Sequence, residues 1–397
     1  HVFQIPKKQY CIAHSGVKYT KKSIFVLLNL TALLLYQIAI TLIPGIGDIN
    51  GKKLIQHCGS AEAVFREKKK NLLRIHGIGR ASAEAIVNQN VLSIAEEEIR
   101  FIEKHGIKTF YFKDKEYPYR LKDCIDSPVM LYYLGETDLN HEKVVGIVGT
   151  RRATDYGRKA TARILEGLVP TGALIVSGLA YGIDSQAHRQ ALKNDLPTVG
   201  VLAHGLDRIY PPQNKTLARK MTRRGGLLSD FISNTNPDRE NFPKRNRIIA
   251  GLCDALIVIE SAMTGGALIT ANIAGSYNRD VFAVPGRVED RWSKGCNYLI
   301  RSNKAALVQD AEDIKYMMGW DEQTEATRSV QTKLFEELEP EEEAIFSIIR
   351  ERGDTGIDDI VDLSGLTATK AAAILLSLEF KGMVKCLPGK IFKAAYG

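Results

Sequence analysis

The segment Val144–Arg151 (VVGIVGTR) constrains the fold of this chain more than any other stretch. Its apolar residues end in Gly-Thr-Arg and open into an amphipathic helical pattern, which is typical of the first strand, turn and helix of a doubly wound α/β domain. Apolar runs recur between helical patterns at 173–176, 198–202, 255–259 and 281–284. Because each run is almost wholly apolar, they predict parallel strands that helices cover on both faces, as in a Rossmann-like sheet.

The length and charge of the chain limit what it can be. Its 397 residues are enough for two or three domains. The net charge of +8 makes nucleic acid or another polyanion a reasonable partner. The six cysteines include no Cys-x-x-Cys pair, so the sequence predicts neither a metal site nor a disulfide framework, and a cytoplasmic location is expected.

The first part of the chain is basic and then apolar. Residues 1–22 contain five lysines and no acidic residue, and an apolar run follows over 24–43. Twenty residues are long enough to span a bilayer, so a membrane segment over 24–43 remains an alternative. We favour an extension over 1–29, whose presence in the native protein is open, followed by a helix over 30–42.

Residues 30–100 contain two similar motifs that predict a helical domain of the helix-hairpin-helix (SAM-like) kind. Ile43–Gly47 and Ile75–Gly79 share the pattern hydrophobic-x-Gly-x-Gly at a spacing of 32 residues. Such a turn exposes backbone N–H groups at a helix N-terminus, where they can hold a phosphate. The alternative is that the glycines only permit tight helix packing. The candidate accessory DNA contacts are Lys52, Lys53, Gly77, Gly79 and Arg80.

Aromatic residues crowd the segment 96–141, which contains the strand-like runs KTFYF at 108–112 and VMLYYL at 129–134. Stacking on nucleic-acid bases is one use of such side chains, but packing an edge extension onto the main sheet is commoner. We therefore predict two extra strands and assign residues 101–318 to one extended Rossmann-like domain.

Four polar loops lie at or near the carboxyl ends of the predicted strands, where open α/β sheets bind ligands. The loops at 149–152 and 177–184 are glycine-rich helix starts that suit a phosphate. The loop at 205–214 is a turn with two prolines, and the loop at 241–247 combines three cations with an aromatic ring. Arginine binds phosphates and stacks on bases, so the last loop suits a single nucleic-acid strand.

These loops resemble those of the DprA (Smf, DNA-processing protein A) family. The ordered motifs are VGTR, SGLAYGID, GLDRIYPPQN, FPKRNRIIAGL, ESAMTGGALITA, VFAVPG and GCNYLI, and the resemblance runs from about residue 35 to the C-terminus. It implies a cytoplasmic, homodimeric single-stranded DNA binder that protects DNA and helps load the RecA recombinase during natural transformation. It also implies an extended Rossmann core with a helical N-terminal domain and a winged-helix-like C-terminal domain.

The resemblance also implies which residues form the site. The residues expected to contact DNA are Gly149, Thr150, Arg151, Ser177, Gly178, Gly182, Phe242, Lys244, Arg245, Asn246 and Arg247. Further candidates for the pocket floor are Glu260, Thr264, Gly265, Gly266 and Thr270.

No catalytic motif accompanies these loops. The sequence has no Walker-A Gly-Lys-Ser/Thr, no His-Glu-x-x-His and no Gly-x-Ser-x-Gly. We therefore expect no enzyme activity, no cofactor and no metal. One alternative is a Rossmann-like hydrolase of nucleoside monophosphates, whose Gly-Gly-x-Gly-Thr loop Thr264–Ala267 only half resembles. The other alternative is a protein-interaction scaffold.

The tail is predicted to be a separate module. A polar linker covers 319–334, and residues 335–397 contain three helical patterns and a β-hairpin, which together predict a winged-helix-like domain. From Lys333 onward the chain has eight Lys and Arg but twelve Asp and Glu, a net charge of −4. The candidate recognition helix has Lys370 as its only cation before its end. Contact with protein is therefore favoured over duplex DNA.

Overall fold

The computed structural model describes residues 21–320, 338–381, 383–387 and 391–394, and these fall into two compact units. The larger unit contains the helical and sheet regions, and the smaller unit lies C-terminal to residue 321. Residues 1–20 of the predicted extension and most of the predicted linker lie outside the described residues.

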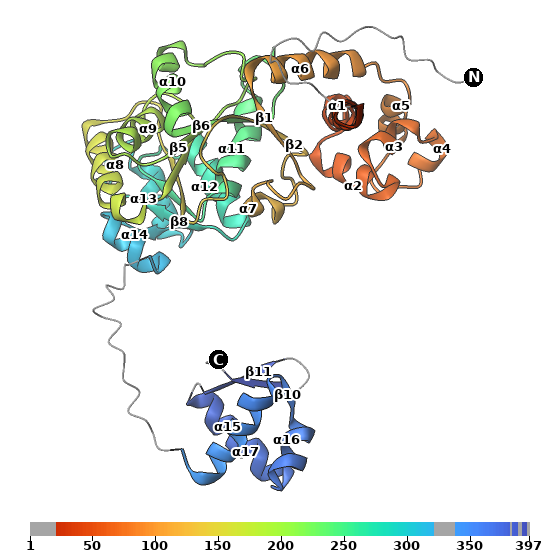
Figure 1. The fold of residues 1–397 in the computed structure, drawn as a ribbon. Coiled ribbons are helices and arrows are strands. Elements are labelled where there is room, and N and C mark those ends of the chain that lie inside the picture. The colour runs from red at the N-terminus through yellow and green to blue at the C-terminus, as the bar shows by residue number, and fades with distance from the viewer. Residues whose placement is uncertain (1–20, 321–337, 382, 388–390, 395–397) are drawn as a thin grey trace. The chain divides into compact units, whose positions relative to one another are not determined.

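Six helices form the N-terminal part of the larger unit: α1 (Lys21–Leu42), α2 (Asp48–Cys58), α3 (Ala61–Arg66), α4 (Lys69–Leu72), α5 (Arg80–Val87) and α6 (Leu92–His105). They enclose an apolar core in which Ile38, Leu54 and Ile86 are buried, with α1 packed against α3 and α6 (Figure 1). As predicted, each Gly-x-Gly loop leads directly into a helix, because Gly47 precedes α2 and Gly79 precedes α5. The predicted start of the first helix at residue 30 is wrong, since α1 begins at Lys21.

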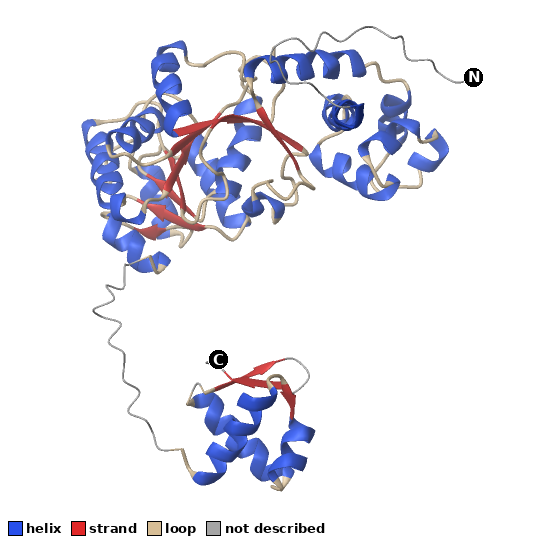
Figure 2. Cartoon of the chain, in the orientation of Figure 1, coloured by secondary structure: helices blue, strands red, loops and turns tan. Residues whose placement is uncertain are grey.

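A nine-stranded sheet forms the centre of the larger unit (Figure 2). Its strands are β1 (Lys108–Tyr111), β2 (Met130–Gly135), β3 (Val144–Val148), β4 (Leu174–Ser177), β5 (Thr198–Val201), β6 (Gly225–Ser229), β7 (Ala255–Val258), β8 (Asp280–Ala283) and β9 (Ala306–Leu307). They lie in the order β1-β2-β6-β5-β4-β3-β7-β8-β9. The strands from β3 to β9 pair in parallel, and the aromatic strands β1 and β2 pair antiparallel at one edge. The predicted mixed α/β fold with a mostly parallel sheet is confirmed.

Helices cover both faces of this sheet, because alternate strand residues point to opposite sides. Val145 and Ile147 of β3 belong to one core, with α8 (Asp155–Gly167), α9 (Ile183–Lys193) and α14 (Ala311–Met318). Val144 and Val148 belong to the other, with α11 (Asn241–Leu252), α12 (Gly266–Ser276) and α13 (Lys294–Arg301). The remaining helical elements are α7 (Tyr119–Lys122), the short helices Val169–Thr171 and Pro212–Asn214, and α10 (Lys215–Arg224), which packs beside α9.

The connection between β3, β4 and β7 determines where a ligand can enter. β3 is the first parallel strand, its successor β4 lies on one side of it, and β7 lies on the other. The loops after β3 and β7 therefore diverge and leave a crevice at the carboxyl edge of the sheet, the topological switch point.

The helical part and the sheet are continuous in the larger unit. The side chains of Met130 and Tyr132 on β2 belong to the helical core, whereas those of Leu131 and Tyr133 belong to the sheet core. Asp48 at the start of α2 also accepts a hydrogen bond of 2.8 Å from the backbone N–H of Val129. The two parts thus share one strand.

The smaller unit contains three helices and three strands: α15 (Pro340–Arg352), β10 (Thr355–Gly356), α16 (Ile357–Ser364), α17 (Ala368–Phe380), β11 (Val384–Leu387) and β12 (Ile391–Ala394). The strands lie in the order β10-β12-β11, and Ile345, Ile360 and Leu375 are buried between the helices. Three helices with a small antiparallel sheet are the arrangement of a winged helix, as predicted.

Among the described residues, no helix is by itself long and apolar enough to cross a membrane. The pair α16 and α17 meets that requirement only jointly and is bent by 111°. Within the apolar run 24–43, residues 38–40 are buried in the helical core of the larger unit.

Candidate functional site

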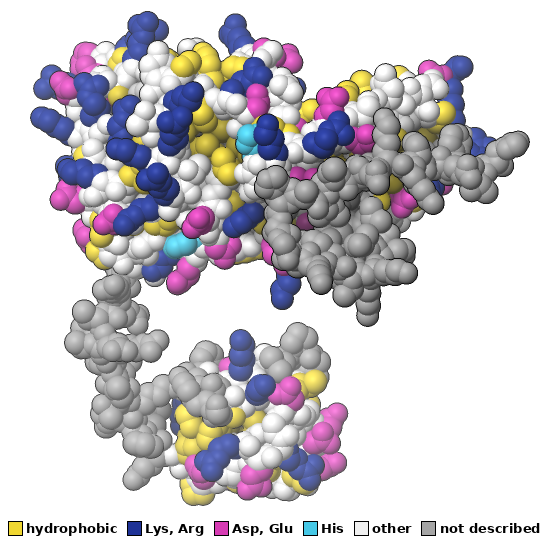
Figure 3. All heavy atoms as spheres, turned by 45° about the horizontal axis from the view of Figure 1, so that its top comes forward, with side chains coloured by type: hydrophobic (Ala, Val, Ile, Leu, Met, Phe, Trp, Pro, Cys, Tyr) yellow, Lys and Arg dark blue, Asp and Glu magenta, His cyan; other side chains and the backbone are white. Residues whose placement is uncertain are grey.

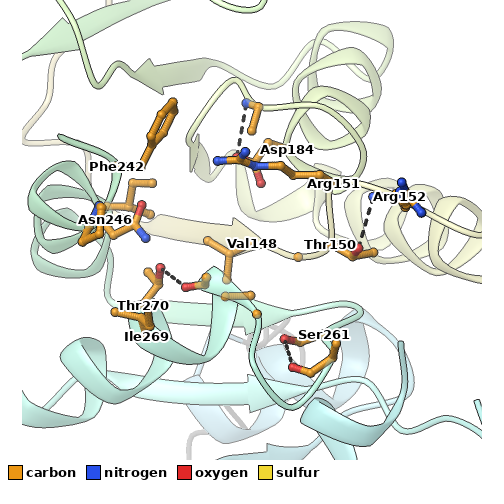
Figure 4. Close-up of a pocket in the computed structure, with 18 of the residues that line it drawn as sticks. Val148, Thr150, Arg151, Arg152, Asp184, Phe242, Asn246, Ser261, Ile269 and Thr270 are labelled. Atoms are coloured by element: carbon orange, nitrogen blue, oxygen red, sulfur yellow. Dashed lines mark hydrogen bonds between the residues drawn. The ribbon is translucent and has the colours of Figure 1, made fainter. Parts of the chain in front are cut away.

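A cavity of about 350 Å³ occupies the switch-point crevice. The loops after β3 and β7 form two of its walls, and α11 and α12 form the others (Figure 4). Figure 4 shows Phe242 and Asn246 of α11 on one side, Thr270 of α12 below them, and Arg151 extending across from the loop after β3. The fold therefore brings the segments 149–152 and 241–247 together, as the resemblance implied.

The loop after β3 is fixed by its backbone. The N–H of Thr150 donates to the carbonyl of Glu260 at 2.8 Å, and the carbonyl of Thr150 accepts from the N–H of Ile183 at 3.1 Å. A Cβ on Gly149 would lie 2.5 Å from Ile183, so only glycine permits this close packing against α9. A rigid loop thus carries Arg151 into the cavity.

Arg151 is exposed, and its guanidinium carbon lies 4.9 Å from the centre of the Phe242 ring. The Phe242 ring is in turn 6.1 Å from that of Tyr210. A guanidinium over an aromatic face gains a cation–π interaction and keeps its N–H donors free for a ligand. Among the described residues no carboxylate pairs with Arg151 within salt-bridge distance, so its charge is available to an anion.

The second glycine-rich loop is a wall of the site rather than a donor of its hydroxyl. Ser177 is fully buried, and its Oγ donates to the carbonyl of Ile147 at 2.6 Å. This hydroxyl is therefore directed into the sheet and does not line the cavity, and its predicted contact with DNA stays a prediction. Gly178 leaves room for Arg245, because a Cβ there would lie 2.5 Å from the Arg245 Nη1 atom. Gly182 has a φ of +78° and abuts the Thr150 carbonyl, so it permits the tight turn into α9.

The cationic motif at 241–247 was predicted as a loop, but it forms the first two turns of α11. Pro243 is compatible with this start because the first turn of a helix needs no N–H donor. The helical period then distributes the motif: Phe242, Arg245 and Asn246 line the cavity, whereas Lys244 and Arg247 line a different hollow beside α2.

Arg245 is buried in the cavity wall and supports two strand ends. Its Nη1 donates to the carbonyl of Gly178 at 2.6 Å and also to the carbonyl of Val201. Burial lowers the pKa of Arg245 to about 10, with the charge of Arg151 acting in the same direction and that of Asp184 opposing it. Arg245 therefore keeps its positive charge at neutral pH, and its Nη1 and Nε atoms already donate to protein acceptors.

Arg247 joins the two parts of the larger unit. Its Nη2 lies 2.8 Å from an Asp48 carboxylate oxygen on α2 and 2.7 Å from an Asp230 carboxylate oxygen after β6. The side chains of Arg247 and Asp230 are only 13% and 9% exposed. The structure thus places Arg247 outside the cavity, where two carboxylates engage it, and its predicted contact with DNA stays a prediction.

The residues predicted for the floor of the pocket also divide into some that line the cavity and some that do not. Gly265 and Gly266 open α12 and line the cavity together with Thr270, whose hydroxyl donates to the Gly266 carbonyl at 3.1 Å. Glu260 and Thr264 do not line it. Glu260 is buried and accepts hydrogen bonds from the backbone N–H, at 3.0 Å, and the hydroxyl of Thr154, so it caps the start of α8.

Trp292 lines the cavity and was not predicted. It follows β8, and its carbonyl accepts a 2.6 Å hydrogen bond from the N–H of Ser261, another lining residue. The general rule that ligands bind beyond the carboxyl ends of the strands would have drawn attention to the segment after β8.

The accessory candidates lie away from this cavity. Lys52 donates to the hydroxyl of Ser127 at 2.8 Å and so joins α2 to the segment before β2, and burial lowers the pKa of Lys52. Arg80 at the start of α5 is exposed and pairs with Glu84 at 3.3 Å. Lys53 lies beside Gly77, since a Cβ there would be 3.5 Å from its Nζ, and Gly79 precedes α5. The structure therefore groups the second Gly-x-Gly loop with Lys53 but not with Arg151 or Phe242.

The sheet order, the cation-lined cavity at the switch point and the separate winged helix define an extended Rossmann-like protein with a winged-helix domain. The family model "DNA recombination-mediator protein A" matches residues 108–319, and the model "DprA winged helix domain" matches residues 331–390. The chain belongs to the DprA/Smf family.

Curated relatives and solved structures agree with this assignment. The chain is 35% identical to Protein Smf of Synechocystis over 390 residues, covering 89% of this chain and 97% of the relative. The structure of DNA processing protein A from Streptococcus pneumoniae matches 75% of this chain and 98% of its own, with a TM-score of 0.59 and 34% identity. The structure from Helicobacter pylori that describes a single-stranded DNA binding mode matches 54% of this chain and 96% of its own, with a TM-score of 0.50 and 29% identity.

Proposed function

We propose that this chain binds single-stranded DNA without sequence preference at the switch-point cavity. The observation that carries the proposal is the pair formed by Arg151 and Phe242, with 4.9 Å between the guanidinium carbon and the ring centre. An exposed arginine that can meet a phosphate and a partly exposed ring beside it that can stack on a base are the two components of sequence-tolerant recognition of single strands. The single-stranded DNA binding mode of the Helicobacter pylori relative supports the same ligand.

The shape of the cavity favours a single strand over a duplex. It is concave, measures about 350 Å³ and has walls on both sides of Arg151. The bases of a duplex are stacked and paired, so a base reaches such a cavity only after unstacking, which costs a few kcal/mol. A single strand does not incur that cost of unpairing.

The test is fluorescence anisotropy with a labelled thymidine oligomer and with a duplex of the same length, repeated at increasing salt. We expect tighter binding of the single strand and an affinity that falls linearly on a logarithmic salt scale, by about 0.7 log units per phosphate contact per decade of salt. Equal affinities for the two DNA forms, without a salt dependence, would contradict the proposal.

Family membership supports a wider role, which we include in the proposal: protection of incoming DNA in the cytoplasm, loading of RecA during natural transformation, and assembly as a homodimer. Light scattering at micromolar concentration tests the dimer, and a strand-exchange assay with RecA and single-strand-binding protein tests loading. If the chain were instead a protein-interaction scaffold, it would bind RecA but would not bind DNA.

The proposed role requires no chemistry at the cavity. Glu260, the carboxylate that the hydrolase alternative would use, is engaged with Thr154 and does not line the cavity. We expect no free base when the protein is incubated with nucleoside monophosphates. Release of base that is lost in an Arg151→Ala variant would instead favour the hydrolase.

A further inference from the structure

A second hollow lies beside the switch-point cavity, between the loop after β3 and the starts of α8 and α9. Its volume is about 480 Å³, and it is more open to solvent than the switch-point cavity. Four of the residues that line it are arginines, and none of its described lining residues is acidic: the arginines are Arg151, Arg152, Arg158 and Arg189. We call it the arginine hollow.

The fold concentrates these cations because β3 and β4 are neighbours. The helices that follow these strands, α8 and α9, pack against each other, so their N-terminal turns lie side by side. Arg158 is in the first turn of α8, and Arg189 is in the second turn of α9. The N-terminal ends of both helices also add positive partial charge to this region.

The cations of the arginine hollow are accessible to a ligand. The side chains of Arg151, Arg152 and Arg189 are exposed. Arg158 pairs with Asp155, but the Asp155 side chain is 86% exposed, so solvent and salt screen that pair. The Nη1 of Arg158 also donates to the Ala153 carbonyl at 2.6 Å, which holds the side chain over the loop.

The hollow continues directly from the cavity. Arg151 and Arg152 line both spaces, so a polymer that leaves the cavity past Arg151 enters the arginine hollow. Tyr181, whose side chain is 42% exposed, stands at the edge of the hollow and offers a second aromatic face near Arg151.

The hollow on the far side of α11 has the opposite electrostatic character. It measures about 580 Å³ and contains Lys244 and Arg247, but three carboxylates also line it: Asp48, Asp126 and Asp230. Two of these already pair with Arg247. A polyanion is therefore repelled there and attracted on the α8–α9 side.

We propose that the arginine hollow binds the sugar–phosphate backbone of the nucleotides next to the one held by Arg151 and Phe242, so that a bound strand passes over the starts of α8 and α9. This inference rests on the proposed function and adds a path to it. The path predicts that Arg158 and Arg189 matter only when the strand is long enough to reach them.

The test compares two double variants, each of which removes two exposed arginines from helices of the same domain. Arg158→Ala with Arg189→Ala removes cations of the hollow, and Arg219→Ala with Arg223→Ala removes cations of α10 that line neither the hollow nor the cavity. Each protein is titrated with thymidine oligomers of about 5 and about 20 nucleotides, one near the lower end of the usual single-strand site sizes and one above their upper end.

We expect the hollow variant to bind the long oligomer roughly tenfold more weakly than wild type, as for two exposed ion pairs, and the short one within about twofold. Its salt slope on the long oligomer should be smaller by about 1.4, because two phosphate contacts are lost. The α10 variant should match wild type on both lengths.

Three results would overturn the inference: equal losses in the two double variants, an equal loss on short and long oligomers, or an unchanged salt slope. These results differ from failure of the proposed function itself, in which wild-type protein binds neither oligomer. Because all four substituted arginines are exposed, the variants are expected to keep the wild-type melting temperature, and the single variant Arg189→Gln provides a milder second measurement.

Discussion

Two regions of this protein are candidates for contact with DNA: the carboxyl edge of the large sheet, where open α/β sheets bind ligands, and the winged helix. At the sheet edge, Arg151 has no carboxylate partner among the described residues and lies over Phe242. On the winged helix, Lys370 is the cation of the early part of α17, and its Nζ lies 2.5 Å from a Glu341 carboxylate oxygen. Figure 3 shows Lys and Arg side chains, with Asp and Glu side chains among them, on the visible faces of both units.

The two regions differ in side-chain chemistry and not only in fold, and under the proposed function this difference favours the sheet edge as the DNA site. The one cation exposed on α17, Lys370, is paired with Glu341, and the exposed positions after it carry Ala372, Ala373, Leu376 and Glu379, which offer no hydrogen-bond donors to phosphates. The cavity instead combines a cation, an aromatic ring and a rigid loop. An apolar helix face in an acidic module suits protein contact better than DNA.

The largest effect that we expect separates stability from binding within the FPKRNR motif. Arg247→Ala should destabilise the protein by roughly 3 kcal/mol or more, because it leaves the Asp230 carboxylate buried without its cation. The melting temperature should fall, while single-strand affinity at a temperature where the variant is folded should stay near wild type. Lys244→Ala, at an exposed neighbour, is the control that should leave the melting temperature unchanged.

The next effect tests the cavity directly. Arg151→Ala should weaken single-strand binding by about 1.5–3 kcal/mol, the cost of a charge-assisted contact, or roughly tenfold to a hundredfold in Kd. The salt slope should fall by about 0.7, because one phosphate contact is lost. Arg151→Lys should restore the slope but only part of the affinity, since an ammonium lacks the flat stacking surface of a guanidinium. A full rescue by lysine would show that charge alone acts there.

Arg245 and Arg247 show how much of the fold and of the site the sequence could predict. Apolar runs and their alternation with helices predicted the parallel sheet, because parallel strands must be apolar on both faces. The motif at 241–247 marked the right region but was predicted to be a loop. Once it forms α11, the period of 3.6 residues places Arg245 at the cavity and Arg247 against α2, a division that composition does not reveal.

Other residues depended on contacts that no local pattern encodes. The Ser177 hydroxyl donates a hydrogen bond to the Ile147 carbonyl, and the Glu260 carboxylate accepts one from the N–H of Thr154. Both partners lie far away in the sequence. Trp292 enters the cavity from the segment after β8, which none of the phosphate-binding motifs indicated. The start of α1 at Lys21 was missed because lysines at 21 and 22 were assigned to a basic extension.

A smaller effect is expected at the aromatic half of the site. Phe242→Ala should cost about 1–2 kcal/mol of single-strand affinity, the value of one stacked base, while the salt slope should remain that of wild type because no phosphate contact is lost. Phe242→Tyr keeps a ring and should bind almost normally. If Phe242→Ala instead lowered the slope as much as Arg151→Ala, the ring would act by positioning Arg151 and not by stacking on DNA.

The smallest effect is expected at Lys370, and it decides the comparison between the two regions. Lys370 is exposed and paired with Glu341, so its replacement removes an ion pair worth at most about 1 kcal/mol and no contact with a core residue. Lys370→Ala should therefore leave both the melting temperature and single-strand affinity near wild type, as measured by differential scanning fluorimetry and anisotropy. The Lys370→Ala variant is also titrated with duplex DNA, because a DNA-binding winged helix would insert α17 into the major groove. If Lys370→Ala weakened DNA binding more than Arg151→Ala, the site would lie on the winged helix, and the acidic surroundings of α17 would not exclude DNA.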